Sequence, residues 1–200
     1  MRTKEKIFNV AQKLFFQKGI DRTSVKEIAE KADINIAALN YHYKSKENLV
    51  DLIFERIIGG FTPSLSDILN SADPLDVKIK KYISTLNDLL IKYNPHLPFF
   101  VMQMMQRNPN KIMQLKCVRQ LYNPENFFDQ IHKEVEKGSI KPVNPLDFFM
   151  TLLSLVGFPF SMQHVLQGQY QWEEKDFIKF IKNREPMIFD ILMNQLKQTY

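Results

Sequence analysis

A short segment in the first quarter of the sequence concentrates side chains that can recognise a polar partner. Amide, hydroxyl, imidazole and ammonium groups alternate there with small or branched apolar residues: Asn35, Ile36, Ala37, Asn40, Tyr41, His42 and Lys46. The spacing predicts a helix from Ile36 to about Tyr43, with Asn35 as a favoured N-cap. A helix this short with a polar outer side is poorly explained as core alone. It is typical of helices that enter the major groove of DNA, where Asn40 can meet an adenine edge and Ile36 a thymine methyl group.

Two further helices are expected to hold this segment in place. The first runs from about Lys4 to Lys18, and Gly19 follows it where a left-handed C-terminal cap is expected. Ser24 opens the second, and Glu27 three residues later predicts a capping box. Asp33 can adopt the left-handed conformation of a tight joint. Two short helices across a tight turn, with a third packed behind, predict a helix-turn-helix.

The segment from residue 4 to 50 resembles the DNA-binding domain of the TetR family of bacterial transcription regulators. The matching residues fall in the family's order: Ile7, Ala11, Leu14, Phe15, Gly19, Thr23, Ser24, Val25, Ile28, Ala29, Ala32, Ile34, Leu39, Tyr41, His42, Tyr43, Lys46 and Leu49. The family usually has Gly where Asp33 stands and Phe where Tyr43 stands. The resemblance implies a divergent helical body that dimerises and holds a ligand pocket.

Combined with the physics of DNA contacts, the resemblance assigns roles to the matched positions. Lys46 would pair with a phosphate at a helix start, and Tyr41 and His42 would contact the DNA backbone. Thr23 and Ser24 would add contacts at the start of the second helix, although Ser24 is also its expected cap. The remaining candidates divide between phosphates and bases: Asn35 would cap and reach a phosphate, and Ile36, Ala37 and Asn40 would face the bases. A solvated lysine, a surface histidine and a polar surface asparagine are the alternatives at these positions.

The charge distribution fits a polyanion held at one end of the molecule. Residues 1–50 hold 10 Lys/Arg and 6 Asp/Glu, so they carry +4 of the net charge of +5. The single cysteine, Cys117, excludes an internal disulfide and suits a reducing compartment. No signal peptide is evident, and the most apolar stretch, residues 152–160, is shorter than the roughly 20 residues of a membrane helix. We therefore expect a cytoplasmic protein without a membrane partner.

Beyond residue 50 the pattern predicts further helices and no strands. A fourth helix, capped by Ser45, is expected to begin at Lys46, and a looser passage around Pro63 to join head and body. Asn or Asp before Pro marks later helix starts, giving helices at about 74–93, 97–106, 109–121, 124–137, 145–167 and, in two pieces around Pro186, 173–198. The expected fold is all-α, with a three-helix DNA-binding domain at 1–50 and a helical bundle for effector binding and dimerisation at 51–200.

Two apolar sets in the body are candidates for these tasks. Adaptable Met and Phe side chains suit a pocket for an apolar effector: Phe99, Phe100, Met102, Met105, Met113, Phe127 and Phe128. Helices that are apolar over more than one stripe suit a homodimer interface: Phe149, Leu152, Leu153, Val156, Met187, Ile188, Ile191 and Leu192. Ordinary core packing is the alternative for both sets.

An enzyme and a helical interaction module are the rival functions. The four histidines are scattered, and the sequence has no Cys cluster and no glycine-rich phosphate loop, so no catalytic residue, metal site or cofactor is expected. A module that uses its basic end on acidic proteins or membranes would bind any polyanion equally. The sequence instead favours a dimeric transcriptional repressor that leaves a palindromic double-stranded DNA operator when a small molecule binds.

Overall fold

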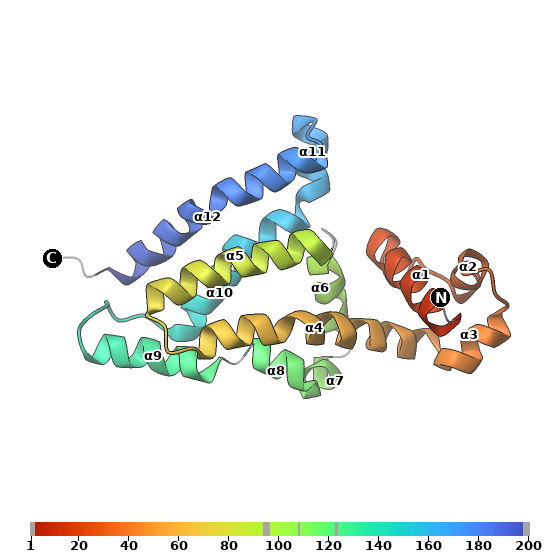
Figure 1. Ribbon diagram of the computed structural model, residues 1–200, viewed down its shortest axis with the longest axis horizontal. Helices are drawn as coiled ribbons and strands as arrows, with labels where there is room; N and C mark the ends of the chain where they lie inside the picture. The colour runs from red at the N-terminus through yellow and green to blue at the C-terminus, as the bar shows by residue number, and fades with distance from the viewer. Residues whose placement is uncertain (1–2, 94–96, 108, 123, 198–200) are drawn as a thin grey trace. The chain divides into compact units, whose positions relative to one another are not determined.

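The computed structural model describes residues 3–93, 97–107, 109–122 and 124–197, and within these ranges every regular element is an α-helix (Figure 1). The expected all-α fold is thereby confirmed. The helices are α1 (Thr3–Lys18), α2 (Val25–Lys31), α3 (Ile36–Tyr43), α4 (Lys46–Asn70), α5 (Leu75–Tyr93), α6 (Leu97–Arg107), α7 (Pro109–Gln114), α8 (Lys116–Tyr122), α9 (Glu125–Glu136), α10 (Pro145–Ser161), α11 (Gln163–Tyr170) and α12 (Glu174–Leu196).

The first three helices begin and end where the local sequence predicts. Gly19 has φ 86° after α1, and Asp33 has φ 51° in the turn between α2 and α3. The Ser24 hydroxyl accepts a hydrogen bond from the N–H of Glu27, and the Asn35 side chain accepts one from Ala38. Side-chain caps of this kind satisfy N–H groups that a helix start leaves without partners.

The capping box of α2 is only half formed. Ser24 caps the backbone as expected, but the Glu27 carboxylate turns to Lys18, whose ammonium donates to it at 2.5 Å. Lys31 lies 3.7 Å from the same carboxylate. The two lysines hold the pKa of Glu27 below its usual value, through the hydrogen bond from Lys18 first. An ion pair with α1 has replaced the local contact, so Glu27 connects two helices.

Helix α4 continues through the passage expected to be loose. It spans Lys46–Asn70 without a break and contains Pro63, although proline removes the bond to the carbonyl four residues earlier. Buried apolar residues recur every four positions across the proline, at Ile57, Phe61, Leu65 and Leu69. Their burial stabilises the helix more than the proline weakens it, since packing supplies most helical stability in proteins.

Three later boundaries also differ from the expected ones. The 109–121 helix is interrupted after Gln114, giving α7 and α8, and the 145–167 helix ends at Ser161 before α11 begins. Pro186 lies inside the continuous helix α12, whose buried stripe runs on both sides of it: Phe177, Ile181, Ile188, Leu192 and Leu196.

No single helix in the described ranges is long and apolar enough to cross a membrane; α10 and α11 meet that criterion only as a pair bent by 53°.

The chain packs as two compact units. The first holds residues 1–60 and 99–118, and the second holds residues 61–98 and 119–200. Most of α6 therefore packs with the N-terminal helices: the ring centroids of Phe100 and Phe16 are 5.2 Å apart, and the Gln103 side chain accepts a hydrogen bond from the N–H of Ile20. The packing units thus differ from a boundary at residue 50, whereas the division into DNA-binding and effector-binding functions remains a prediction.

The core of the second unit forms where α5, α9, α10 and α12 pack together. The ring of Phe149 lies 6.0 Å from Tyr82 on α5 and 6.2 Å from Phe127 on α9. Aromatic pairs at such spacing, set edge to face, add stability beyond the area they bury. These helices provide the scaffold on which the remaining faces of α10 and α12 are displayed.

Two glycines provide a matched test of this backbone. Gly59 lies inside α4, where an added Cβ would meet nothing within 4 Å, so Gly59→Ala should raise the free energy of unfolding by about 0.5–1 kcal/mol. Gly138 is equally open but has φ 71°, so Gly138→Ala should lower it by about 1–2 kcal/mol. Urea unfolding followed by circular dichroism measures both. Shifts of the same sign would contradict the assigned conformations.

Candidate DNA-binding interface

Helix α3 buries one side and displays the other. Leu39 and Tyr43 are 0% and 2% exposed, while Ile36 is 44% and Tyr41 84% exposed. The remaining outward positions, Asn35, Ala37 and Asn40, are also exposed. Since residues four apart share a helix face, the buried pair forms one stripe and the candidate contact residues lie on the rest of the surface. Six of the nine predicted DNA-contacting residues are therefore brought together on one exposed surface: Asn35, Ile36, Ala37, Asn40, Tyr41 and, half-buried beside Tyr41, His42.

Hydrogen bonds at both ends fix the orientation of α3. The Asn35 side chain accepts from the N–H of Ala38 at 2.7 Å, and the Tyr43 hydroxyl donates to the carbonyl of Lys4 on α1 at 2.8 Å. Burial raises the pKa of Tyr43 above its usual value. Asn48 on α4 donates to the carbonyl of Tyr43 at 2.9 Å. The two bonds of Tyr43 connect α3 to α1 and α4, and they fix the orientation in which its outer side is presented.

The turn between α2 and α3 is closed by backbone bonds. Asp33 takes φ 51°, and the N–H of Ile34 donates to the carbonyl of Ala29 at 3.0 Å. Asp tolerates this conformation better than most residues with a Cβ. The substitution of Asp for the family's usual Gly therefore leaves the turn intact.

Lys46 stands at the first position of α4, where backbone N–H groups favour an anion. Its side chain is half-buried and forms no ion pair with the described residues. The Ser45 hydroxyl accepts from the N–H of Asn48 at 3.1 Å and so completes the helix start. An uncompensated cation beside free N–H groups suits a DNA phosphate.

The structure gives Thr23 and Ser24 mainly structural tasks. Thr23 is 1% exposed, and its hydroxyl donates to the carbonyl of Gly19 at 2.9 Å. Its side chain is therefore unavailable to a ligand, and only its backbone could take part in a contact. Ser24 is exposed, but its hydroxyl caps α2.

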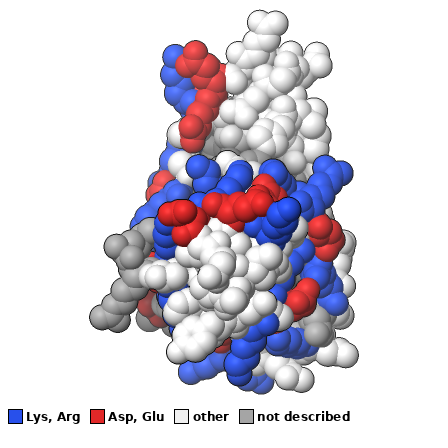
Figure 2. All heavy atoms as spheres, turned by 90° about the vertical axis from the view of Figure 1, so that its right-hand side faces the viewer, with Lys and Arg blue, Asp and Glu red and all other residues white. Residues whose placement is uncertain are grey.

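The lysines and arginines near the interface do not form one continuous positive surface. Figure 2 views the side on which α1–α3 lie in Figure 1, and it shows acidic side chains interspersed among the lysines and arginines. Lys18 and Lys31 both face Glu27, and Lys26 lies 3.9 Å from Glu30. Cations already paired with carboxylates gain less from a phosphate. Sequence reasoning missed Lys44, an exposed lysine at the end of α3 with φ 63°, which the spacing Lys44-Ser45-Lys46 could have indicated.

The predicted effector residues fall into different packing environments. Phe100 packs in the core of the first unit, its ring 5.2 Å from Phe16 and 6.2 Å from Phe54, and its role in an effector pocket stays a prediction. Phe127 and Phe128 pack with Phe149 in the second unit. The methionines all belong to the first unit, with Met102 and Met113 exposed and Met105 half-buried, and the side chain of Phe99 lies outside the described residues.

Most residues predicted for a dimer interface are core of their own chain. Five of the eight are buried against neighbouring helices: Phe149, Leu152, Val156, Ile188 and Leu192. Their side chains are taken up by packing within the chain, so their assignment to a dimer interface stays a prediction. Met187 and Ile191 are exposed and Leu153 is half-buried. Sequence reasoning missed Leu146 and Met150, which lie one turn apart on α10 and are exposed.

Comparison with known proteins decides the identity. The model of the "Bacterial regulatory proteins, tetR family" matches residues 7–53, which include α2, α3 and the start of α4. The Bacillus subtilis (strain 168) protein named "Probable HTH-type transcriptional regulator YttP" is 27% identical over 198 residues, covering 98% of this chain and 90% of the relative. Residues 7–53 thus match the DNA-binding domain of the TetR family, and nearly the whole chain is similar to a transcriptional regulator.

Solved structures agree with this assignment at the level of the fold. PfmR, a TetR family transcriptional regulator from Thermus thermophilus, superposes with a TM-score of 0.71 at 19% identity, covering 94% of this chain and 96% of that one. FadR from Bacillus subtilis, solved in complex with stearoyl-CoA, superposes with a TM-score of 0.63 at 16% identity, covering 96% and 99%. The matched family, the Bacillus relative and these fold neighbours are all transcriptional regulators.

Replacing Lys46 tests the phosphate contact. Lys46→Ala should weaken binding to all DNA sequences and reduce the slope of log affinity against log salt by about one unit. Gel-shift titrations over a range of salt measure that slope. Lys179→Ala, which removes the same charge from an exposed position on α12, is the control and should leave the slope unchanged. An unaltered slope for Lys46→Ala would exclude the contact.

Replacing Asn40 tests a base contact. Asn40→Ala should cost about 1–3 kcal/mol at one base pair and relax the preference there, with little effect on non-specific binding. Competition between operator variants changed at single positions measures the preference. A uniform loss over all variants would make Asn40 a backbone contact instead.

Proposed function

We propose that this regulator is a cytoplasmic homodimeric repressor that binds a palindromic operator through two copies of α3 and leaves it when a small apolar effector binds. The exposed outer side of α3, held by Leu39, Tyr43 and the Asn35 cap, is the observation that carries the proposal. Its side chains provide one amide (Asn40), one phenol (Tyr41), one imidazole (His42) and apolar groups for base edges and phosphates. Cationic Lys46 stands at the edge of this surface.

A single α3 is too small for a specific operator. Its outward residues span about two turns of helix, which covers only a few base pairs. Specific binding in this class of motif comes from two recognition helices on half-sites one helical turn apart, roughly 34–36 Å. Two-fold symmetry of the protein then requires a palindromic operator. This need for a second copy supports the homodimer.

The dimer surface that we propose lies on the outer faces of α10 and α12, which pack against each other within the chain. Leu146 and Met150 are exposed one turn apart on α10, and Met187 and Ile191 are exposed one turn apart on α12. Side chains of this size are usually buried, and an apolar stripe on two adjoining helices is typical of an interface. The buried neighbours of these residues keep the helices rigid enough to present it.

An apolar effector is supported by composition and by one fold relative. The second unit contains the aromatic cluster of Phe127, Phe128, Phe148 and Phe149, between α9 and α10. The FadR structure contains stearoyl-CoA, which carries a long apolar chain. A ligand that binds one arrangement of the body better than another shifts the population of DNA-binding dimers. Repacking of Phe128, which is half-buried, would admit such a ligand.

Selection of bound fragments from a random DNA library tests the repressor proposal. The expected result is one enriched inverted repeat whose affinity falls steeply with salt. Equal enrichment of all sequences would instead favour a module that binds any polyanion. Single, unpaired half-sites would contradict the homodimer while leaving DNA recognition by α3 in place.

Charge placed on the exposed stripe tests the dimer surface. Ile191→Glu should convert dimers to monomers at micromolar concentration and weaken operator binding by at least about tenfold, because a buried unpaired carboxylate destabilises an interface. Sedimentation velocity measures the oligomeric state. Met113→Glu, at an exposed methionine of α7, is the control and should remain dimeric. A dimeric Ile191→Glu variant would place the interface elsewhere.

A further inference from the structure

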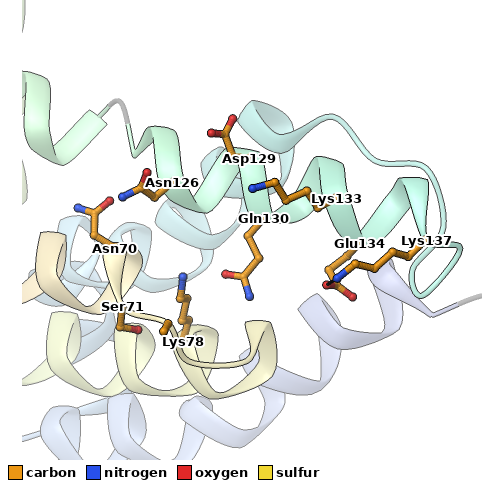
Figure 3. A pocket seen from close by; sticks show the side chains of 10 residues that line it. Asn70, Ser71, Lys78, Asn126, Asp129, Gln130, Lys133, Glu134 and Lys137 are labelled. Atoms are coloured by element: carbon orange, nitrogen blue, oxygen red, sulfur yellow. Dashed lines mark hydrogen bonds and ion pairs between the residues drawn. The ribbon is translucent and has the colours of Figure 1, made fainter.

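A polar hollow of about 420 Å³ lies in the second unit, between the end of α4, the start of α5 and helix α9 (Figure 3). It is lined by amides, lysines and carboxylates: Asn70, Ser71, Ala72, Lys78, Asn126, Asp129, Gln130, Lys133, Glu134 and Lys137. None of the aromatic residues assigned to the apolar effector lines it. Two groups at its floor have incomplete interactions.

Lys78 is the first of these groups. Its side chain is 2% exposed, and its ammonium donates to the carbonyl of Leu69 at 2.9 Å. The negative charge of Asp73 acts on Lys78, but the Asp73 carboxylate accepts its hydrogen bond from Lys81, at 2.7 Å. Burial lowers the pKa of Lys78, and Asp73 only partly opposes this. A buried ammonium with one neutral acceptor is unfavourable unless an anion completes its shell.

Gln130 is the second group with incomplete interactions. Its Nε2 donates to the carbonyl of Asp73 at 3.2 Å, which fixes the orientation of the amide. The Oε1 atom is then buried and has no hydrogen-bond partner among the described residues. Figure 3 shows Gln130 on α9 and Lys78 on α5 pointing toward each other across the hollow. An acceptor and a cation beside one space suit a ligand that has both a negative charge and a donor.

The rim leaves one more cation available. Lys137 pairs with Glu134 at 2.9 Å and holds the pKa of that carboxyl below its usual value. Lys133, one turn before Lys137, is exposed and forms no ion pair within the described ranges. Asn126 and Asp129 can accept hydrogen bonds from further hydroxyl groups.

We propose that this hollow binds a small oxyanion that carries a neighbouring hydroxyl group, as in a polyol phosphate monoester or a hydroxycarboxylate. The oxyanion lies between Lys78 and Lys133, and the hydroxyl donates to Oε1 of Gln130. This polar site is separate from the apolar effector and from the surface of α3, so the inference stands without the proposed function.

Isothermal titration calorimetry on the full-length protein at constant ionic strength tests the site. Glycerol 3-phosphate should bind once per chain, and propyl phosphate, which lacks the hydroxyls, should bind about tenfold more weakly because Oε1 of Gln130 then stays without a donor. Glycerate distinguishes the two sources of the anion. If glycerate binds better than the phosphate, the site is assigned to hydroxycarboxylates.

Variants connect the binding to the named residues. Lys133→Gln, at an exposed position that cannot affect folding strongly, should reduce affinity about tenfold. Gln130→Leu should abolish the preference for glycerol 3-phosphate over propyl phosphate, and Lys179→Gln on α12 is the unchanged control. Absence of binding by both glycerol 3-phosphate and glycerate would overturn the proposal. Binding that Lys133→Gln and Gln130→Leu leave unaltered would overturn it as well.

Discussion

The burial of Leu39 and Tyr43 is the interaction on which the function depends. These two side chains are the fully buried residues of this eight-residue helix, and most of the others are exposed. A helix so short has little stability of its own, because nucleation is costly and few backbone bonds follow it. Its position is therefore set by tertiary contacts. The Tyr43 hydroxyl donates to the carbonyl of Lys4, the Asn48 amide donates to the carbonyl of Tyr43, and Leu39 is buried. Without them the outer side would have no fixed direction.

The electrostatics complement this geometry. Several lysines of the N-terminal domain already face carboxylates, as the pairs of Glu27 and Glu30 show. Such exposed pairs contribute little to stability, but they keep the domain from acting as a uniform polycation. Lys44 and Lys46, which lie beside α3, form no ion pair among the described residues and are available for DNA. This arrangement is consistent with the proposal that recognition depends on the side chains of α3.

Local features of the fold followed from the sequence, and long-range packing did not. The caps at Ser24 and Asn35 and the turn at Asp33 depend on a few adjacent residues, so their types sufficed to predict them. Pro63 and Pro186 indicated breaks, yet both lie inside helices, because buried stripes that continue past each proline outweigh a lost backbone bond. The candidate surface on α3 was predictable for the same local reason. Thr23, before α2, was not, because its hydroxyl is buried and donates to the carbonyl of Gly19.

The body shows the limit of such reasoning. Phe100 and Phe127 are both phenylalanines of the set predicted to line the effector pocket, but they belong to different packing units. On α12, Ile188 and Ile191 are separated by less than one turn, and only the second is exposed. Which stripe of an apolar helix faces the core depends on neighbours distant in sequence. The polar hollow likewise requires Lys78 and Gln130, 52 positions apart, to meet.

Methylation interference on selected operator DNA tests most directly whether the outer side of α3 enters the major groove. Dimethyl sulfate modifies guanine N7 in the major groove and adenine N3 in the minor groove. If α3 enters the major groove, methylated guanines should block binding in two clusters about one helical turn apart, while methylated adenines between them should not. Interference confined to adenine N3, or no interference from guanine N7 within the bound site, would contradict it.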